Sequence, residues 1–222
     1  MEASNIDNNN SQPVIFKGQF GDFTITDGDR HEVTLYRLGL GLIALCLGAG
    51  VSLLYWQGAT ITVLHSLTAL YLLLAVGLGI SLWTIHIYLA PLHRTLQVFW
   101  AIGTLSSLVI MVKGTEPLLL TIYQHPQLIL GIGFLFAALT GIFFKEAFCF
   151  NRLETKGLTL LTPTILLGHL THLIPPHTNL ILLSIAAVLM GIFAFRKAIQ
   201  SRPDDIGDKS VFEYLKQQRT TP

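Results

Sequence analysis

The side chains best suited to chemistry gather in one short polar segment that follows an apolar stretch. Within ten residues the chain carries Lys145, Glu146, Cys149, Arg152 and Glu154. If a helix continues through this segment, Lys145, Cys149 and Arg152 share one face, since side chains three and four positions apart meet on a helix. Such a set could bind an anionic lipid, a cofactor or a partner protein. The competing interpretation is an interfacial anchor whose charges pair with one another.

Two histidines suggest a metal site beside that segment. His86 and His93 flank a predicted turn between two apolar helices, on the same side of the membrane as the polar segment. Imidazole is the commonest protein metal ligand, and the predicted metal ligands are His86, His93, Glu146 and Cys149. A wider cofactor site would comprise His86, His93, Lys145, Glu146, Cys149 and Arg152. The spacing matches no motif of known mechanism, and helix-end histidines also bond to backbone carbonyls or head groups, so the cofactor is unknown.

Other histidines fall on the opposite side of the predicted bundle, where His65, His169 and His172 are the intramembrane polar candidates. His169 lies about twelve residues into its predicted helix, hence roughly 18 Å from the start of that helix. Ionisable groups at such depth are functional candidates. One interpretation is a neutral histidine bonded to a neighbouring Ser or Thr, and the other is a proton sensor facing an acidified compartment.

The elements that must position these residues are membrane helices. Apolar residues make up 51% of the 222-residue chain and charged residues 12%, against about 25% in soluble domains, and the mean hydropathy is +0.58. No basic patch indicates a nucleic-acid partner. Six apolar segments approach the roughly 20 residues that a bilayer core requires, at 36–56, 60–89, 92–112, 127–144, 158–174 and 178–195. The predicted fold is an all-α bundle of six transmembrane helices.

The basic residues predict the orientation of this bundle. With six crossings, all Lys and Arg except Lys113 fall on one side, which makes 13 of the 14. Cytoplasmic loops are enriched in these residues, so both termini are predicted to be cytoplasmic.

The predicted divisions are a disordered tail over 1–13, an N-terminal element over 14–35, the membrane domain over 36–199, and a cytoplasmic tail over 200–222. Aromatic residues around two glycines indicate that residues 14–26 form either a short hairpin or an interfacial flap. A turn is predicted at 57–60, and a short apolar stretch at 115–123 could be an interfacial helix. In the tail, Ser210 and Glu213 have the spacing of a capping box before a helix at 211–218.

Small residues recur every four positions and predict close contacts between helices. Gly133, Ala137 and Gly141 form one such row, and the other rows comprise Ala44, Gly48 and Ser52; Ala75 and Gly79; Gly103 and Ser107; and Ala187 and Gly191. Small side chains let backbones approach in lipid, where little hydrophobic drive exists between helices. The sequence has no internal repeat that would support a duplicated transporter architecture.

An intramembrane hydrolase is disfavoured. Intramembrane prenyl-protein endopeptidases carry paired glutamates, an Arg four residues later, and a Phe-x-x-x-His. Here Lys145 replaces the first glutamate, Arg152 follows Glu146 by six residues, and Ile165 stands where Phe would precede His169. Glu146 and His169 are also predicted near opposite faces of the membrane, so they could not share one metal ion.

Several blocks give the chain a family resemblance, namely KGQFGDFTIT, TIHIYLAPLHRTLQVFWAIG, FAALTGIFFKEAFCFNRLETK, LLGHLT and PDDIGDKSVFEYLKQQR. The chain resembles small multi-spanning integral membrane proteins of cyanobacteria and plastid-bearing organisms, a family known as a domain of unknown function. The resemblance spans nearly the whole chain and implies a thylakoid or plasma-membrane location. It implies no activity, cofactor or catalytic residue.

The function that the sequence favours is a non-enzymatic accessory or assembly factor for a membrane complex, with no catalytic residues predicted. It would contact the lipid bilayer, and its segments 145–156 and 210–219 would bind subunits of a membrane complex. The resemblance suggests that this complex is photosynthetic. This hypothesis depends on the membrane interior lacking paired carboxylates and nucleophile triads. The alternatives are a binder of a metal, haem-like or lipid cofactor, and a small-solute transporter.

Overall fold

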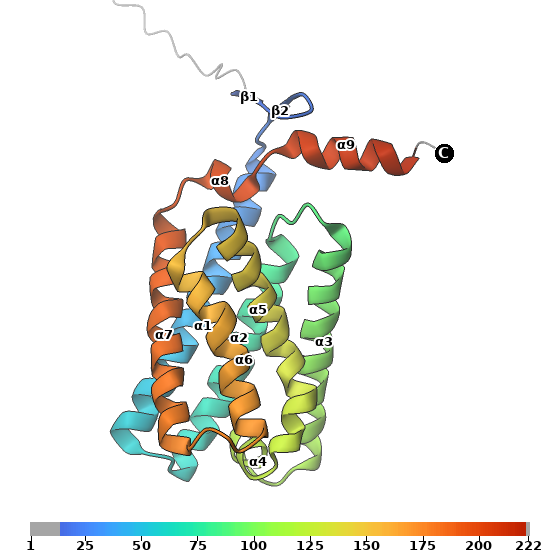
Figure 1. Ribbon diagram of the computed structural model, residues 1–222. Helices are drawn as coiled ribbons and strands as arrows, with labels where there is room; N and C mark the ends of the chain where they lie inside the picture. Colours follow the sequence, from blue (N-terminus) through green and yellow to red (C-terminus); the bar gives the residue numbers. More distant parts are fainter. Residues whose placement is uncertain (1–13, 221–222) are drawn as a thin grey trace, which may run out of the picture.

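A computed structural model describes residues 14–220, in which six long helices lie side by side in one bundle (Figure 1). These helices are α1 (Asp27–Gln57), α2 (Ile61–Thr84), α3 (Ala90–Lys113), α5 (Ile129–Phe150), α6 (Leu153–Leu170) and α7 (Pro176–Ile199). Five segments, α1, α2, α3, Pro126–Phe150 and α7, are long and apolar enough to cross a membrane. The shorter α6 carries Glu154 and Lys156 near its start. The prediction of an all-α membrane protein is confirmed, with five candidate spans.

The predicted ends of several helices are wrong, and two of the errors change how the site is built. The second helix ends at Thr84 rather than at residue 89, which places His86 in a connecting loop. The α5 helix continues beyond residue 144 to Phe150 and ends at Asn151, whose φ of 51° is left-handed. Asn tolerates this conformation better than most residues. The reversal puts Arg152 at the start of α6, so it does not share a helical face with Lys145 and Cys149.

Local capping signals explain where α1 and α2 begin. The α1 helix starts at Asp27, earlier than the predicted membrane segment, because Thr26 and Asp29 form a capping box. The predicted turn after α1 is confirmed, with Gly58 at a φ of 67° and the Thr60 hydroxyl accepting from the Val63 N–H at 3.4 Å. This tight turn brings α1 and α2 together as an antiparallel pair.

Close helix contacts occur at some of the predicted small residues and not at others. A Cβ on Gly103 would meet the Leu135 backbone, and one on Gly141 would meet Leu96, so α3 packs tightly on α5. In contrast, a Cβ on Gly48 or Gly191 would meet no described atom within 4 Å, and these two predictions are wrong. A close α1–α2 contact lies instead at residues that the sequence pattern did not single out, Gly39 and Gly77. The apolar core between the helices includes Leu40, Leu78, Leu135, Ile142, Met190 and Phe193.

A polar cap covers the bundle end where both ends of the described chain lie (Figure 1). We use "cap" for the hairpin of β1 (Ile15–Lys17) and β2 (Asp22–Thr24) together with α8 (Arg202–Ile206) and α9 (Lys209–Thr220). The strands are antiparallel, with Phe16 opposite Phe23, which confirms the predicted hairpin. The tail helix also forms, but it begins with Asp208, whose Oδ1 accepts from the Ser210 N–H at 2.9 Å, rather than with the predicted Ser210–Glu213 box. The disorder predicted for residues 1–13 lies outside the described residues.

The other end of the bundle is closed by short elements. The α4 helix (Leu118–Gln124) and the 3₁₀ turn η1 (Pro126–Leu128) connect α3 to α5 and lie at the end away from the cap (Figure 1). The short apolar stretch predicted at 115–123 forms α4. We call this the distal end.

Candidate functional site

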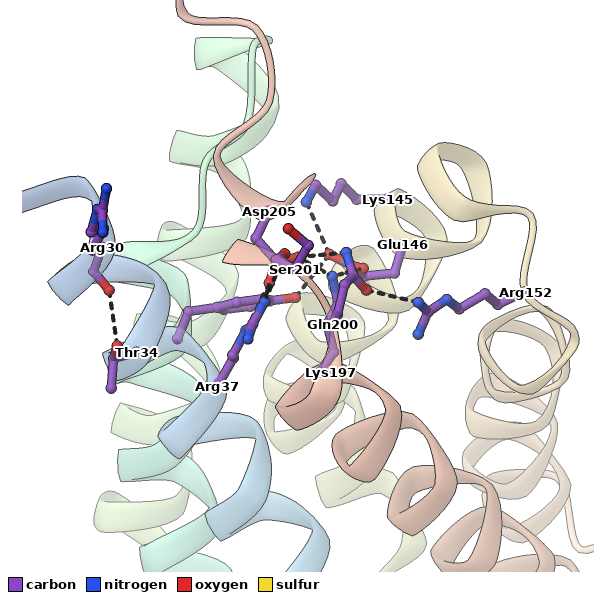
Figure 2. Close-up of polar contacts among 11 residues, drawn as sticks. Arg30, Thr34, Arg37, Lys145, Glu146, Arg152, Lys197, Gln200, Ser201 and Asp205 are labelled. Carbon is purple, nitrogen blue, oxygen red and sulfur yellow. Dashed lines mark hydrogen bonds and ion pairs between the residues drawn. The ribbon is translucent and has the colours of Figure 1, made fainter. Parts of the chain in front are cut away.

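A buried ion network lies just beneath the cap (Figure 2). The side chains of Glu146 on α5 and Lys197 on α7 are both 0% exposed. The Lys197 Nζ lies 2.6 Å from Glu146 Oε2 in an ion pair that lacks hydrogen-bond alignment, and it also pairs with Asp205 of α8. The other carboxylate oxygen, Glu146 Oε1, accepts from Tyr36 Oη and from Lys145 Nζ, both at 2.9 Å. One carboxylate therefore joins α1, α5 and α7.

Asp205 connects the network to Arg37 of α1 and to Gln200, which follows α7. The Arg37 Nε and Nη2 atoms donate to Asp205 Oδ2 at 2.9 and 2.6 Å, and Gln200 Nε2 donates to Oδ1 at 3.2 Å. Arg37 Nη2 also donates to the Ser201 carbonyl at 3.1 Å. These bonds fix α8 against α1 and the end of α7.

The charges of this network are compensated inside the protein. Lys197 Nζ also lies 4.2 Å from the centre of the Phe150 ring, a distance at which a cation is attracted to an aromatic face. Buried charges are strongly unfavourable unless they are paired. All four carboxylate oxygens of Glu146 and Asp205 already face a cation or a donor. This arrangement is suited to holding helices in register, and it leaves little capacity to ligate a metal or to move a proton.

The predicted metal ligands are not brought together. The His93 Nε2 lies 2.5 Å from the Leu82 carbonyl oxygen, whereas the His86 Nε2 lies 3.3 Å from Glu32 Oε2. Glu146 is enclosed in the ion network, and Cys149 is exposed. Among residues 14–220, no three His, Cys, Asp or Glu side chains are grouped so that they could hold a metal ion. The geometry gives the predicted metal site no support.

Half of the wider predicted cofactor set does share one cleft. His86, Lys145 and Cys149 line a space of about 600 Å³, together with Phe144, Phe148, Asp204 and other residues of α5, α8 and the α2–α3 loop. Burial lowers the pKa of His86, which favours a neutral ring. The remaining predicted members lie elsewhere: His93 faces α2, Glu146 is in the ion network, and Arg152 Nη2 donates to Gln200 Oε1 at 2.8 Å.

Contacts between the hairpin and the tail hold the cap together. Asp208 Oδ2 accepts from the Gln19 N–H at 2.6 Å, and Ser210 Oγ accepts from the Phe20 N–H at 3.0 Å. The Phe20 ring stacks on Tyr214 with the ring centres 3.9 Å apart. Hydrogen bonds from Ser210 and Gln19 lower the pKa of Asp208. Residues about 190 positions apart thus form one unit.

Tyr88 of the α2–α3 loop connects the cap to the bundle. Its Oη accepts from the Asp208 N–H at 2.6 Å, and its ring lies 4.6 Å from that of Phe212. Burial raises the pKa of Tyr88, which keeps the hydroxyl protonated. The docked cap therefore contacts the loop that also carries His86.

The three histidines predicted within the membrane lie near the distal end. His169 occupies the last turn of α6, where its ring stacks on Tyr123 of α4 at 5.3 Å. His172 lies in the turn after α6 with a φ of 56°, so it is not in a membrane helix as predicted. His65 is exposed near the start of α2. Because Glu146 lies beneath the cap, it is remote from His169, in agreement with the argument against a hydrolase (Figure 1).

Three residues that complete the ion network, Tyr36, Lys197 and Asp205, were not among the predicted site residues. Lys197 was counted only among the basic residues outside the membrane, Tyr36 marked the start of an apolar segment, and Asp205 was given no role. A lysine directly after an apolar helix normally extends to the interface. The sequence does contain one signal for this ion pair. Two acidic residues, Asp204 and Asp205, follow Lys197 closely enough that a short turn of the chain can bring a carboxylate back to the lysine.

Comparison with known proteins places the chain in a family. Searches of curated proteins and of solved structures give no significant match. A family model described as "Uncharacterized integral membrane protein (DUF2301)" matches residues 80–214, more than half of the chain. The matched region contains Glu146, Lys197 and Asp205 of the ion network. The resemblance to an uncharacterised membrane family is confirmed, and the chain belongs to the DUF2301 family of integral membrane proteins.

Proposed function

We propose that all six long helices cross the membrane and that the cap faces the cytoplasm. The α6 helix packs between α5 and α7 along the bundle, and six crossings place both ends of the chain on one side (Figure 1). That side then carries 13 of the 14 Lys and Arg residues, as cytoplasmic surfaces do. The resemblance to cyanobacterial and plastid proteins suggests that the membrane is a thylakoid or plasma membrane.

On this orientation, the protein acts as an accessory or assembly factor that docks a subunit of a membrane complex through its cap. The observation that carries this proposal is an ordered hairpin with exposed apolar side chains. Val14 and Ile15 are each 65% exposed and Phe20 is 47% exposed, while hydrogen bonds to Asp208 and Ser210 hold the hairpin in place. A two-stranded hairpin offers free edges to which an extended segment of a partner can add.

The partner that fits this surface is a protein with an extended apolar segment at the cytoplasmic side of a membrane complex. If the resemblance extends to the biological setting, that complex is photosynthetic. The rigid attachment of the hairpin to α9 means that a partner would meet a preformed surface, which reduces the entropy lost on binding.

The test is purification from native membranes in mild detergent, with cross-linking and quantitative mass spectrometry. The unmodified protein should recover a defined set of complex subunits in constant ratio. Ile15→Glu places a charge on the exposed hairpin face and should abolish that recovery, whereas Lys113→Glu at the distal end should not. Recovery of the protein alone, or equal recovery with Ile15→Glu, would overturn the proposal.

The orientation has its own test. Tags at the two termini, probed with protease in sealed vesicles of known sidedness, should both be on the cytoplasmic side. If the two tags are found on opposite faces of the membrane, the chain does not cross it six times, and the cap is not placed on the cytoplasmic side as proposed.

A second candidate function is the binding of a small cofactor in the cleft lined by His86, Lys145 and Cys149. The observation in its favour is that these three reactive side chains share a space of about 600 Å³, which lies within the range of small-molecule sites. Purified protein should then show stoichiometric absorbance or a bound compound that is lost in Cys149→Phe. A clean spectrum and an empty extract would eliminate this candidate.

A further inference from the structure

An open groove lies on the outside of the bundle between α1 and α7, next to the cap. It has a volume of about 700 Å³, and most of its lining residues are apolar. Its charged lining residues are Arg37 of α1 and Arg202 of α8, and no described Asp or Glu lines it. The groove shares no residue with the exposed hairpin or with the cleft at Lys145. It therefore combines an apolar surface with two cations at one end.

Small residues keep the apolar part of the groove open. A Cβ on Gly41 of α1 or on Gly191 of α7 would meet no neighbouring side chain or helix within 4 Å. Leu45 and Phe195, which also line the groove, are 72% and 66% exposed and would face lipid. Along α1 the groove runs from Thr34 to Leu45, roughly 16 Å at the helical rise of 1.5 Å per residue. That length is about half of a 30 Å hydrocarbon core, which suits an acyl chain of one leaflet.

Arg37 has hydrogen-bonding capacity left on its guanidinium. Its Nε and Nη2 donate to Asp205, and Nη2 also donates to the Ser201 carbonyl, which holds the group between α1 and the end of α7 (Figure 2). The third nitrogen, Nη1, is not buried and donates to no described residue. A guanidinium can donate in several directions at once. An anion in the groove can therefore accept from Nη1 while Asp205 stays bound.

The buried ion network next to the groove contains more cations than carboxylates. Arg37, Lys145 and Lys197 are three cations, and they pair with only two acidic residues, Glu146 and Asp205. The network therefore retains one net positive charge. Such a charge beside the hydrocarbon region is unfavourable unless an anion approaches it. Charge complementarity thus favours an anionic ligand at this end of the groove.

Arg202 supplies a further cation at the same end. It is exposed and forms no ion pair among residues 14–220. Arginine binds phosphate oxygens through paired N–H groups, more strongly than it binds neutral acceptors. A zwitterionic head group would bring its own ammonium close to the two arginines, and no described carboxylate lines the groove to receive that ammonium. The groove therefore favours a phosphate that is not accompanied by a cation.

We propose that the α1–α7 groove binds an anionic phospholipid, with its phosphate at Arg37 and Arg202 and one acyl chain along Gly41 and Gly191. Cytoplasmic leaflets carry anionic lipids, and basic pockets between membrane helices on that side bind their head groups. The leaflet of this site rests on the proposed orientation of the bundle, but the binding itself does not. Binding is also independent of a partner at the cap, so each proposal can fail alone.

Native mass spectrometry of the full chain, released from micelles, tests the charge requirement. The protein is titrated with dioleoylphosphatidylglycerol and with dioleoylphosphatidylcholine, which share their chains and differ in net charge. One molecule of the anionic lipid should bind, and more tightly than the zwitterionic lipid. Arg202→Gln should weaken that binding about fivefold, the effect of one basic residue near anionic lipid. Arg94→Gln, an exposed change near the start of α3 at the same end of the bundle, is the matched control and should bind normally.

A second pair of variants tests the acyl chain. Gly41→Leu fills the open groove and should weaken binding of phosphatidylglycerol, whereas Gly133→Leu in α5, where a Cβ would meet only Ile129 of its own helix, should not. Glycerophosphoglycerol, the same head group without chains, should not compete, and neither should inorganic phosphate. Equal affinity for the two lipids would overturn the proposal, as would equal affinity in Arg202→Gln and Arg94→Gln, unchanged affinity in Gly41→Leu, or competition by the free head group or by phosphate.

Discussion

The two ends of the bundle bury different kinds of polar group. Beneath the cap, Glu146, Lys197 and Asp205 are buried, and each is paired with an opposite charge. At the distal end, a pocket of about 300 Å³ between α4, α5, α6 and α7 is lined by no Asp, Glu, Lys or Arg among the described residues. Charges that compensate one another hold the helices together beneath the cap, whereas the distal end depends on apolar packing around neutral polar side chains.

The difference matters for the search for function. Lys145 and Glu146, which have the most reactive side chains of the polar segment, are bonded to each other within the ion network. Strong charge density in the sequence therefore indicates structural anchoring here rather than chemistry. Most of the following variants are paired with the same substitution at a control position, so that they test that distinction.

The largest effect is expected for Lys197→Met. This change keeps the length of the side chain but leaves Glu146 and Asp205 without their shared cation, and breaking a buried ion pair lowers stability by about 3–5 kcal/mol. The free energy of unfolding can be measured by steric trapping in micelles. Lys113→Met, at the exposed end of α3, should change stability by less than about 0.5 kcal/mol.

The pairing itself can be tested in the same background. Adding Glu146→Gln and Asp205→Asn to Lys197→Met leaves Lys145 and Arg37, which pair with these carboxylates, without an opposite charge. The triple variant should therefore be less stable than Lys197→Met alone. If it is equally stable or more stable, the charges are not what holds this end together.

A smaller difference is expected between two tyrosines of the same helix. Tyr36→Phe removes a hydrogen bond to a buried carboxylate, which is worth about 1.5–3 kcal/mol. Tyr55→Phe, near the distal end of α1, removes a 3.2 Å bond from Ser184 at a residue that is 60% exposed, and should cost about 0.5 kcal/mol or less. The measurement is again the free energy of unfolding, and equal losses would show that the network has no special role.

The next effect is confined to the cap. Because hydrogen bonds lower the pKa of Asp208, its contribution is complete above the ordinary carboxyl value of 3.8 and is lost as pH falls through the lowered value. The protection factors of the Gln19 and Phe20 amides, which correct for the intrinsic hydrogen-exchange rate at each pH, should therefore be smaller in acid. Asp208→Ala should weaken it at neutral pH, while Asp22→Ala in the hairpin should leave these two amides protected.

Local signals made much of the fold predictable. Apolar length predicted the membrane helices, Gly58 and Thr60 predicted the first turn, and aromatic residues around Gly18 and Gly21 predicted the hairpin as one of two possibilities. Each of these depends on residues that are close in sequence, which is why a single chain suffices to detect them. The end of α5 was misjudged because a left-handed Asn151 is one conformation among several that the residue can adopt.

The candidate site was less predictable because its contacts join distant segments. Sequence spacing brought His86 and His93 into one hairpin, yet it could not show that the His93 ring turns to the Leu82 carbonyl. Nor could it show that Lys197 folds back to Glu146, since charged residues next to a membrane helix usually face water. Burial and side-chain direction follow from packing between helices, which sequence periodicity does not specify.

The smallest effect expected concerns His86 of the α2–α3 loop. Burial lowers the pKa of His86, so the folded protein takes up this proton less readily than the unfolded chain. The stability linked to His86 is therefore complete above the ordinary pKa of 6.5 and declines as the pH falls from there through the lowered pKa of the folded state. Replacing it by Gln should therefore reduce the drop in melting temperature between pH 7.5 and 5.5. His177→Gln, an exposed change at the distal end, should leave that drop unaltered. An identical pH dependence in wild type and His86→Gln would mean that the ring is as free to ionise in the fold as in water, and that the cap does not shield the loop beneath it.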